Sequence, residues 1–69
     1  MIIKKVVLRR TKNSVFYPGD LLFYKRRNCE VTILGVDTVF GGYRVIFHDY
    51  ETVGNLPHDF IKYLYNICN

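Results

Sequence analysis

The sequence predicts one mainly β domain: a small closed or half-closed barrel of five or six short strands, with a short C-terminal helix or 3-10 turn. The chain has 69 residues, of which 49% are hydrophobic, so a small packed core is expected rather than a disordered chain. Short apolar segments alternate with turn dipeptides such as Pro18-Gly19 and Gly41-Gly42. Because few residues are available to cover an open sheet, its closure into a barrel is favoured.

The first half of the chain contains two predicted strands. Residues 2–9 are rich in Ile and Val and form the first, which ends at the polar turn 11–14. In the Pro18-Gly19 dipeptide, proline presets φ and glycine permits a left-handed step, so a second turn is expected there. The apolar segment 21–25 then forms the second strand, and residues 26–28 form the loop after it.

The second half contains three further predicted strands. Residues 30–36 alternate in polarity, with one face formed by Val31, Ile33 and Val36. Gly41-Gly42 predicts a hairpin turn, because glycine tolerates the positive φ that such turns need. Residues 43–50 give the clearest alternation, which places Tyr43, Val45 and Phe47 on one face and Arg44, Ile46 and His48 on the other. Residues 51–56 form a further short strand.

The C-terminal segment 57–67 fits two structures. Apolar residues recur at the spacing of an amphipathic helix, at Phe60, Ile61, Leu64 and Ile67. Pro57 would then occupy an N-terminal position of that helix. A 3-10 turn over residues 57–60, followed by a last strand over residues 62–65, fits the same sequence.

Positive charge is concentrated in the first part of the chain. The net charge is +4, but residues 1–28 contain eight Lys or Arg against one Asp, whereas residues 29–69 contain two against five Asp or Glu. Such an asymmetry favours an anionic partner. Cations on edge strands also discourage aggregation of sheets, and this alternative explains the same residues.

Cysteine and histidine show no pattern of a metal or disulfide site. Cys29, His48, His58 and Cys68 are too widely spaced for a zinc signature, and two cysteines are few for a secreted disulfide framework. Free thiols, no metal and no cofactor are therefore expected. The apolar runs are too short to cross a bilayer, and the N-terminus lacks a signal-peptide pattern, so we expect a cytoplasmic protein with no membrane partner.

The order of the predicted strands resembles that of SH3-like small barrels, especially Tudor-type domains. The resemblance rests on "PGDLLFYKRR", "VTILGVD" and "YRVIFHDYETVGNLPHDFIKYL", covers residues 17–64, and leaves the first strand as an addition. Tudor-type domains bind methylated Lys or Arg in an aromatic cage, and the resemblance implies cage positions at Phe47 and Tyr50. The other two cage positions fall near Arg26 and Cys29, which are not aromatic. The resemblance thus implies the fold more than that activity.

Nucleic-acid binding is the first functional hypothesis. DNA-binding barrels of similar shape contact phosphates through a basic face, and phosphate contacts require Lys or Arg. Lys25, Arg26 and Arg27 form a loop cluster and are the main candidates. The other candidates also lie in the basic part of the chain: Lys4, Arg9, Arg10, Lys12 and the aromatic residue Tyr24, with Tyr17 and Phe23 as further stacking surfaces.

A protein-interaction module is the alternative hypothesis. SH3-like barrels present grooves and sheet edges to peptides. A composition rich in Ile, Lys, Asn and Tyr is frequent in mobile elements, so a phage- or plasmid-encoded inhibitor that docks on an acidic surface of a host protein also fits. The chain would act as a monomer, or as a homodimer through Phe60, Tyr63 and Tyr65.

Catalysis is not expected. His48 and Asp49 are adjacent, but neighbouring side chains on a strand point to opposite faces, so Asp49 would not orient the imidazole. Arg27 lies close to Cys29 in sequence and would lower the pKa of its thiol, yet no base accompanies it.

Overall fold

The computed structural model describes residues 7–10 and 15–68, and for residues 7–10 and 68 it describes the backbone alone. In these residues, six strands and one 3-10 helix follow each other in the order β1 (Val7–Arg10), β2 (Leu21–Tyr24), β3 (Cys29–Val36), β4 (Tyr43–Phe47), β5 (Thr52–Leu56), η1 (His58–Tyr63) and β6 (Leu64–Cys68). The mainly β class and the number of strands predicted from the sequence are confirmed.

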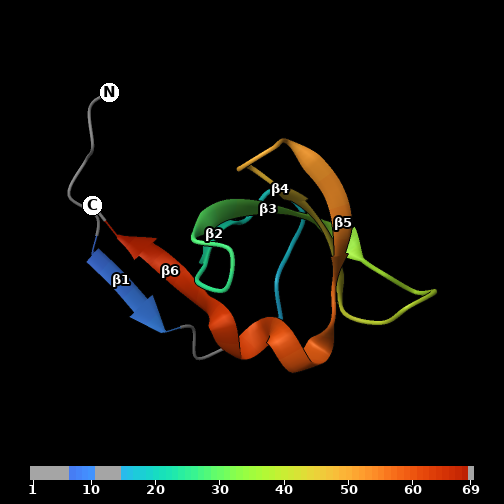
Figure 1. The fold of residues 1–69 in the computed structure, drawn as a ribbon. Coiled ribbons are helices and arrows are strands. Elements are labelled where there is room, and N and C mark those ends of the chain that lie inside the picture. Colours follow the sequence, from blue (N-terminus) through green and yellow to red (C-terminus); the bar gives the residue numbers. More distant parts are fainter. Residues whose placement is uncertain (1–6, 11–14, 69) are drawn as a thin grey trace.

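The described strands form one antiparallel sheet in the order β1-β6-β2-β3-β4-β5. Strands β2 to β5 are joined by three successive hairpin connections, and η1 returns the chain so that β6 lies between β1 and β2. Figure 1 shows the sheet bending strongly, so that β6 and β5 lie on opposite sides of the curve and η1 spans the gap between their ends.

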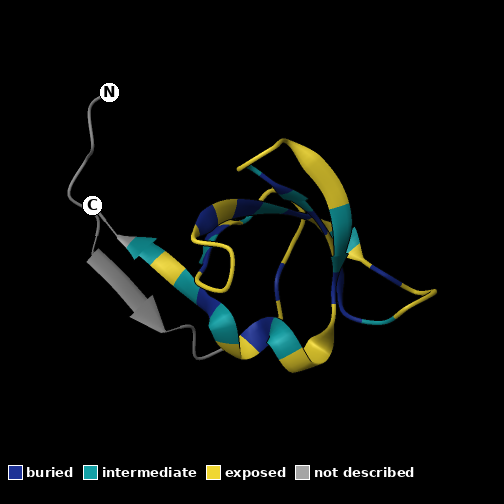
Figure 2. Ribbon diagram, viewed as in Figure 1, coloured by how far each residue is buried: buried dark blue, intermediate teal, exposed yellow. Residues whose placement is uncertain are grey.

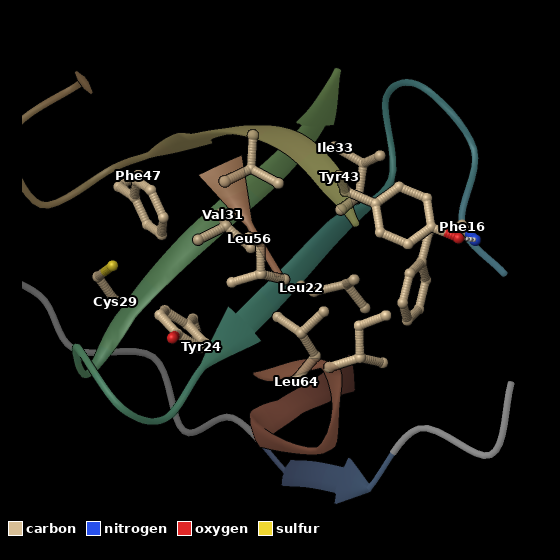
Figure 3. Packing of buried hydrophobic residues seen from close by; sticks show 12 residues of the cluster. Phe16, Leu22, Tyr24, Cys29, Val31, Ile33, Tyr43, Phe47, Leu56 and Leu64 are labelled. Carbon is tan, nitrogen blue, oxygen red and sulfur yellow. Dashed lines mark hydrogen bonds between the residues drawn. The ribbon is translucent and has the colours of Figure 1, made fainter. Parts of the chain in front are cut away.

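The concave side of the sheet contains the core. Residues on β2, β3 and β4 alternate between buried and exposed or half-buried positions, as expected for strands covered on one face (Figure 2). The predicted faces of the fourth strand are confirmed, because Tyr43, Val45 and Phe47 are buried. The core cluster consists of Phe16, Leu22, Tyr24, Cys29, Val31, Ile33, Tyr43, Val45, Phe47, Leu56, Ile61 and Leu64 (Figure 3).

Aromatic pairs close this core at both ends. Phe16 lies edge-on to Tyr43 with 5.4 Å between ring centroids, and its backbone N–H donates a hydrogen bond to the Tyr43 hydroxyl at 3.1 Å. At the other end, the rings of Tyr24 and Phe47 lie 5.8 Å apart. Phe16, which precedes β2, is therefore a core residue that the alternation of the strands does not reveal.

The exposure of Val36 at the end of β3 differs from its predicted place beside Val31 and Ile33. Val36 was expected on the same face as Val31 and Ile33, but its side chain is 66% exposed whereas theirs are fully buried. The register against β4 shifts between Ile33 and Gly35. The shift places Val36 opposite the buried Tyr43, on the core side of the sheet, but Val36 is the last residue of β3 and stays exposed there.

The ends of several strands also differ from the predicted ones. The predicted strand 43–50 ends at Phe47, because residues 48–51 form a turn in which Glu51 has a positive φ of 54°. The following strand starts at Thr52 rather than at residue 51, and β2 ends at Tyr24. Of the predicted strand 2–9, residues 2–6 lie outside the described part of the chain, as do residues 11–14.

The C-terminal segment adopts the second of its two predicted structures, a 3-10 helix followed by a strand. Pro57 precedes η1 in an extended conformation, and the Phe60 N–H donates a hydrogen bond to the Pro57 carbonyl at 3.0 Å. Ile61 anchors η1 in the core, while Phe60 and Tyr63 pack against it and stay half-buried. The longer helix is excluded because the backbone is already extended at Leu64.

The loop between β3 and β4 is built around the buried side chain of Asp37, which is 3% exposed. One carboxylate oxygen accepts hydrogen bonds from the N–H groups of Val39 and Phe40, each at 3.0 Å. The other accepts a hydrogen bond from the Asn55 amide at 2.9 Å, and the same amide donates to the Gly41 carbonyl at 2.7 Å. Residues 37–42 therefore have a fixed conformation, held by β5.

The carboxylate of Asp37 makes stability depend on pH. Hydrogen bonds from the Phe40 N–H and then from the Asn55 amide lower the pKa of Asp37 below its usual value. Because the folded-state pKa lies below the unfolded value of about 3.9, this stabilisation is complete at neutral pH and is lost as the pH falls through the folded-state pKa. Asp37→Asn places a donor against the Asn55 amide, so we expect its Tm at pH 7 to be lower by about 5 °C or more.

Thermal melts between pH 7 and pH 2.5 test this assignment. The difference in Tm between the native chain and Asp37→Asn should narrow below about pH 4, because the native chain then loses the same charge. Asp59→Asn, which alters an exposed carboxylate on η1, is the control and should show no such change. A constant difference for Asp37→Asn over the whole pH range would contradict the assignment.

Candidate nucleic-acid interface

The loop cluster predicted from the sequence lies in the tight turn between β2 and β3. Residues 25–28 are all exposed, and Asn28 completes the turn with a positive φ of 52°. The Arg27 and Asn28 N–H groups donate hydrogen bonds back to Tyr24 and Lys25, and the Lys25 N–H donates to the Tyr63 carbonyl at 3.0 Å. The turn is therefore fixed to the end of η1, although about 35 residues separate them in sequence.

Arg26 lies on a platform of two aromatic rings from η1. Its guanidinium carbon is 4.9 Å from the ring centroid of Phe60 and 5.2 Å from that of Tyr63. The Lys62 ammonium lies 5.4 Å from the same Tyr63 ring. Such cation–π contacts hold the guanidinium plane while its N–H groups stay available for other partners.

Lys25 extends this surface onto β6, with its ammonium 5.4 Å from the ring centroid of Tyr65. We call the three exposed cations of this surface the cationic cluster: Lys25, Arg26 and Lys62. Among the described residues, ion pairs are made by Arg27, Arg44 and His48, and none involves a member of this cluster. Its positive charge is therefore not neutralised by a carboxylate of the described chain.

Arg27 differs from its two neighbours. Its Nε and Nη2 atoms donate hydrogen bonds to both carboxylate oxygens of Asp49, at 3.0 and 2.8 Å, and its guanidinium lies 4.1 Å from the Phe47 ring centroid. Burial alone would raise the pKa of Asp49, but the hydrogen bond from Arg27 and that from the Tyr50 N–H outweigh it and lower the pKa. Arg27 thus fastens the 25–28 turn to the 48–51 turn, and its charge is satisfied within the fold.

The aromatic residues that the sequence predicted beside the cations are not those whose rings lie under the cationic cluster. Tyr24 is only 4% exposed and belongs to the core, so it offers no stacking surface, and Phe23 is half-buried on β2. Tyr17 is 67% exposed but lies before β2, at the opposite end of that strand from the turn. The aromatic residues that accompany the cations are Phe60, Tyr63 and Tyr65, for which the sequence suggested a dimer surface.

Phe47 and Tyr50 do not form the pocket expected from the Tudor resemblance. Phe47 is 6% exposed, and the Arg27 guanidinium covers its ring, whereas Tyr50 is 80% exposed in the turn after β4. A cation already belonging to the fold therefore lies against the ring that the pocket would need.

The remaining predicted cations lie mostly outside the described side chains. Arg9 and Arg10 belong to β1, where their backbones pair with Asn66 and Tyr65 of β6. Lys4 and Lys12 lie outside the described residues. Of the cations predicted from the sequence, Lys25, Arg26 and Arg27 are thus the ones whose side-chain contacts are described.

A hydrogen-bonded chain on the outer side of the sheet was not anticipated. The Thr32 hydroxyl lies 2.6 Å from His48 Nε2, and His48 Nδ1 lies 2.7 Å from a Glu51 carboxylate oxygen. Glu51, rather than Asp49, therefore orients the imidazole. The order hydroxyl, imidazole, carboxylate is one that activates nucleophiles. Here it joins β3 to the 48–51 turn.

The chemistry of the other candidate groups is limited. Burial raises the pKa of the Cys29 thiol despite the nearby charge of Arg27, contrary to the shift expected from the sequence, so the thiol stays protonated near neutral pH. In the described part of the chain, His, Cys, Asp and Glu form no group of three that would hold a metal ion. None of its helices has the length and apolar character needed to span a membrane.

No protein-family model, curated protein or solved structure matches this chain.

Proposed function

We propose that this protein is a non-enzymatic binding module that contacts the phosphates of nucleic acids through the cationic cluster. The observation that carries the proposal is the contrast within one turn: Arg27 is paired with Asp49, whereas Arg26 lies on two aromatic rings with no carboxylate partner among the described residues. Because the rings already restrict such a guanidinium, it loses little further conformational freedom when it binds a phosphate.

The strand order supports the related proposal that the domain is an SH3-like barrel. Strands β2 to β5 follow each other as hairpins, a 3-10 helix comes after Pro57, and β6 returns to pair with β2. This is the sequence of elements that the resemblance implies for residues 17–64, with β1 added beyond β6. In such a barrel the 25–28 turn is one of the loops that meet partners.

The cationic cluster favours contact with the phosphate backbone of a nucleic acid over recognition of its bases. The rings of Phe60, Tyr63 and Tyr65 each have a cation over one face, so that face is not open to a base. Phosphate contacts carry no sequence information and depend strongly on salt. We therefore expect binding that varies little with sequence and that weakens as salt increases.

Fluorescence anisotropy with labelled duplex DNA and single-stranded RNA, from about 20 to 300 mM salt, tests the proposal. Arg26→Ala should weaken binding about three- to tenfold at low salt and reduce the log–log salt slope by about 1. Arg44→Ala removes the same charge from β4, where the guanidinium is exposed and makes only a long ion pair of 3.8 Å with Asp37, and should change the affinity by less than about twofold. Arg27 is left in place because its ion pair fastens two turns.

Two outcomes would contradict the proposal. Equal losses for Arg26→Ala and Arg44→Ala would mean that net charge, not the cationic cluster, determines binding. Absence of binding to both nucleic acids at the lowest salt would rule out the proposed phosphate contacts and leave an acidic protein surface as the alternative partner.

A further inference from the structure

The loop between β3 and β4 displays the most exposed aliphatic and phenylalanine side chains of the described chain. Val39 is 79% exposed and Phe40 is 75% exposed, with Val36 at the base of the loop 66% exposed. We call these three residues the apolar tip. The loop is not loosely built, because Asp37 and Asn55 fix its backbone by the hydrogen bonds described above. Because the backbone is fixed, these solvent-exposed apolar side chains are preorganised for contact with a partner.

We infer that the apolar tip is a self-association surface, at which two copies of this chain pack about a two-fold axis. Charge placement favours a second copy as the partner. The carboxylate of Asp37 is buried, accepts hydrogen bonds within the loop and lies 3.8 Å from the exposed Arg44 guanidinium, so it brings no exposed negative charge to the axis. A two-fold axis places each side chain near its own equivalent, which suits apolar groups and disfavours charged ones.

The position of the cationic cluster supports the same partner. The 25–28 turn precedes β3 and the apolar tip follows it, so they lie at opposite ends of that strand, whose eight residues span roughly 26 Å at about 3.3 Å each. Association through the tip keeps the basic ends of two chains apart, and repulsion between them is then weak beyond a Debye length of about 10 Å.

Further exposed apolar side chains at the same end of the sheet are available to the interface. A standard interface takes about 800 Å² from each partner, which three side chains alone do not supply. Of the nine exposed large apolar residues described, seven lie at the end of the sheet where β2 starts and β3 ends: Val15, Tyr17, Leu21, Leu34, Val36, Val39 and Phe40. Hydrogen bonds from Phe16 to Tyr43 and from Gly19 to Ile33 tie the segment before β2 to this end.

Sedimentation velocity from about 1 to 500 μM protein tests the inference, since self-association depends on concentration. The native chain should show a monomer–dimer equilibrium within this range. The double variant Val39→Ser/Phe40→Ser should raise the dimer Kd at least about tenfold. Its Tm, measured at low concentration, should stay unchanged, because the loop hydrogen bonds use the backbone N–H groups of these residues.

Tyr50→Ser is the matched control, because Tyr50 is an equally exposed aromatic residue (80%) in a turn at the other end of the sheet. Dimerisation should be unaffected by this change. A native chain that stays monomeric up to the highest concentration, or a dimer that survives the double variant, would overturn the inference. A monomer that binds phosphatidylcholine vesicles only with the tip intact would also overturn it and assign the tip to a lipid surface.

Discussion

Val45→Asp is expected to leave the chain unfolded at 25 °C. Val45 is 0% exposed in the middle of β4, and its neighbours in the core cluster are predominantly apolar. A carboxylate placed there loses its hydration without gaining a partner, at a cost of several kcal/mol. A domain of this size has a free energy of unfolding of only about 3–5 kcal/mol, so the cost of this single substitution is expected to exceed it.

Far-UV circular dichroism during a thermal melt measures this effect. Ile46→Asp is the control, because Ile46 is the next residue of β4, lies on its other face and is half-buried. We expect Ile46→Asp to melt cooperatively at a reduced Tm. A cooperative melt for Val45→Asp would contradict the placement of β4 in the fold.

Gly42→Ala has the second-largest expected effect. A Cβ atom at position 42 would overlap the backbone carbonyl oxygen of Leu56 and lie 2.9 Å from Pro57 Cα, and backbone atoms cannot rotate away as a side chain can. The φ of Gly42 is +74°, a left-handed conformation that costs an L-residue about 1–2 kcal/mol by itself. Together these effects should abolish most of the stability, as a urea titration would measure.

Gly41→Ala separates the two causes. Gly41 has a similar φ of +79° in the same loop, but the atom nearest to its added Cβ is a side-chain carbon of His58 at 3.8 Å, an ordinary contact. We expect a loss of about 1–2 kcal/mol for Gly41→Ala and a much larger one for Gly42→Ala. Equal decreases in the free energy of unfolding for the two variants would mean that the backbone of β5 does not approach Gly42 as closely as described.

The fold was predictable where the polarity of the sequence follows the period of a strand. The alternation from Tyr43 to Phe47 identified both faces of β4, because each residue there occupies one position of a regular ladder. The exposure of Val36 was not predictable, since the polarity of the residues does not show where β3 extends past the core. The structure of residues 57–67 could not be decided from the sequence, because the same apolar residues fit both a helix and a 3-10 turn followed by a strand.

The candidate site was predictable only as a turn rich in cations. The sequence "KRR" contains no sign that Arg27 meets Asp49 from another turn while Arg26 meets two rings from η1, because both partners are brought close only by the sheet. The aromatic residues of the site were assigned to a dimer surface for the same reason. The partner of the His48 imidazole could have been predicted from one feature of the sequence, because Glu51 follows His48 by three residues and is close enough to reach it.

The pairing of β1 has a consequence for how the protein is made. All described pairings of β1 are with β6, so β1 cannot join the described sheet until β6 exists. During synthesis, residues 7–10 leave the ribosome long before residues 64–68. Strand β1 therefore stays unpaired until β6 has been synthesised, and the pairing of β1 with the sheet forms only after residues 64–68 have emerged.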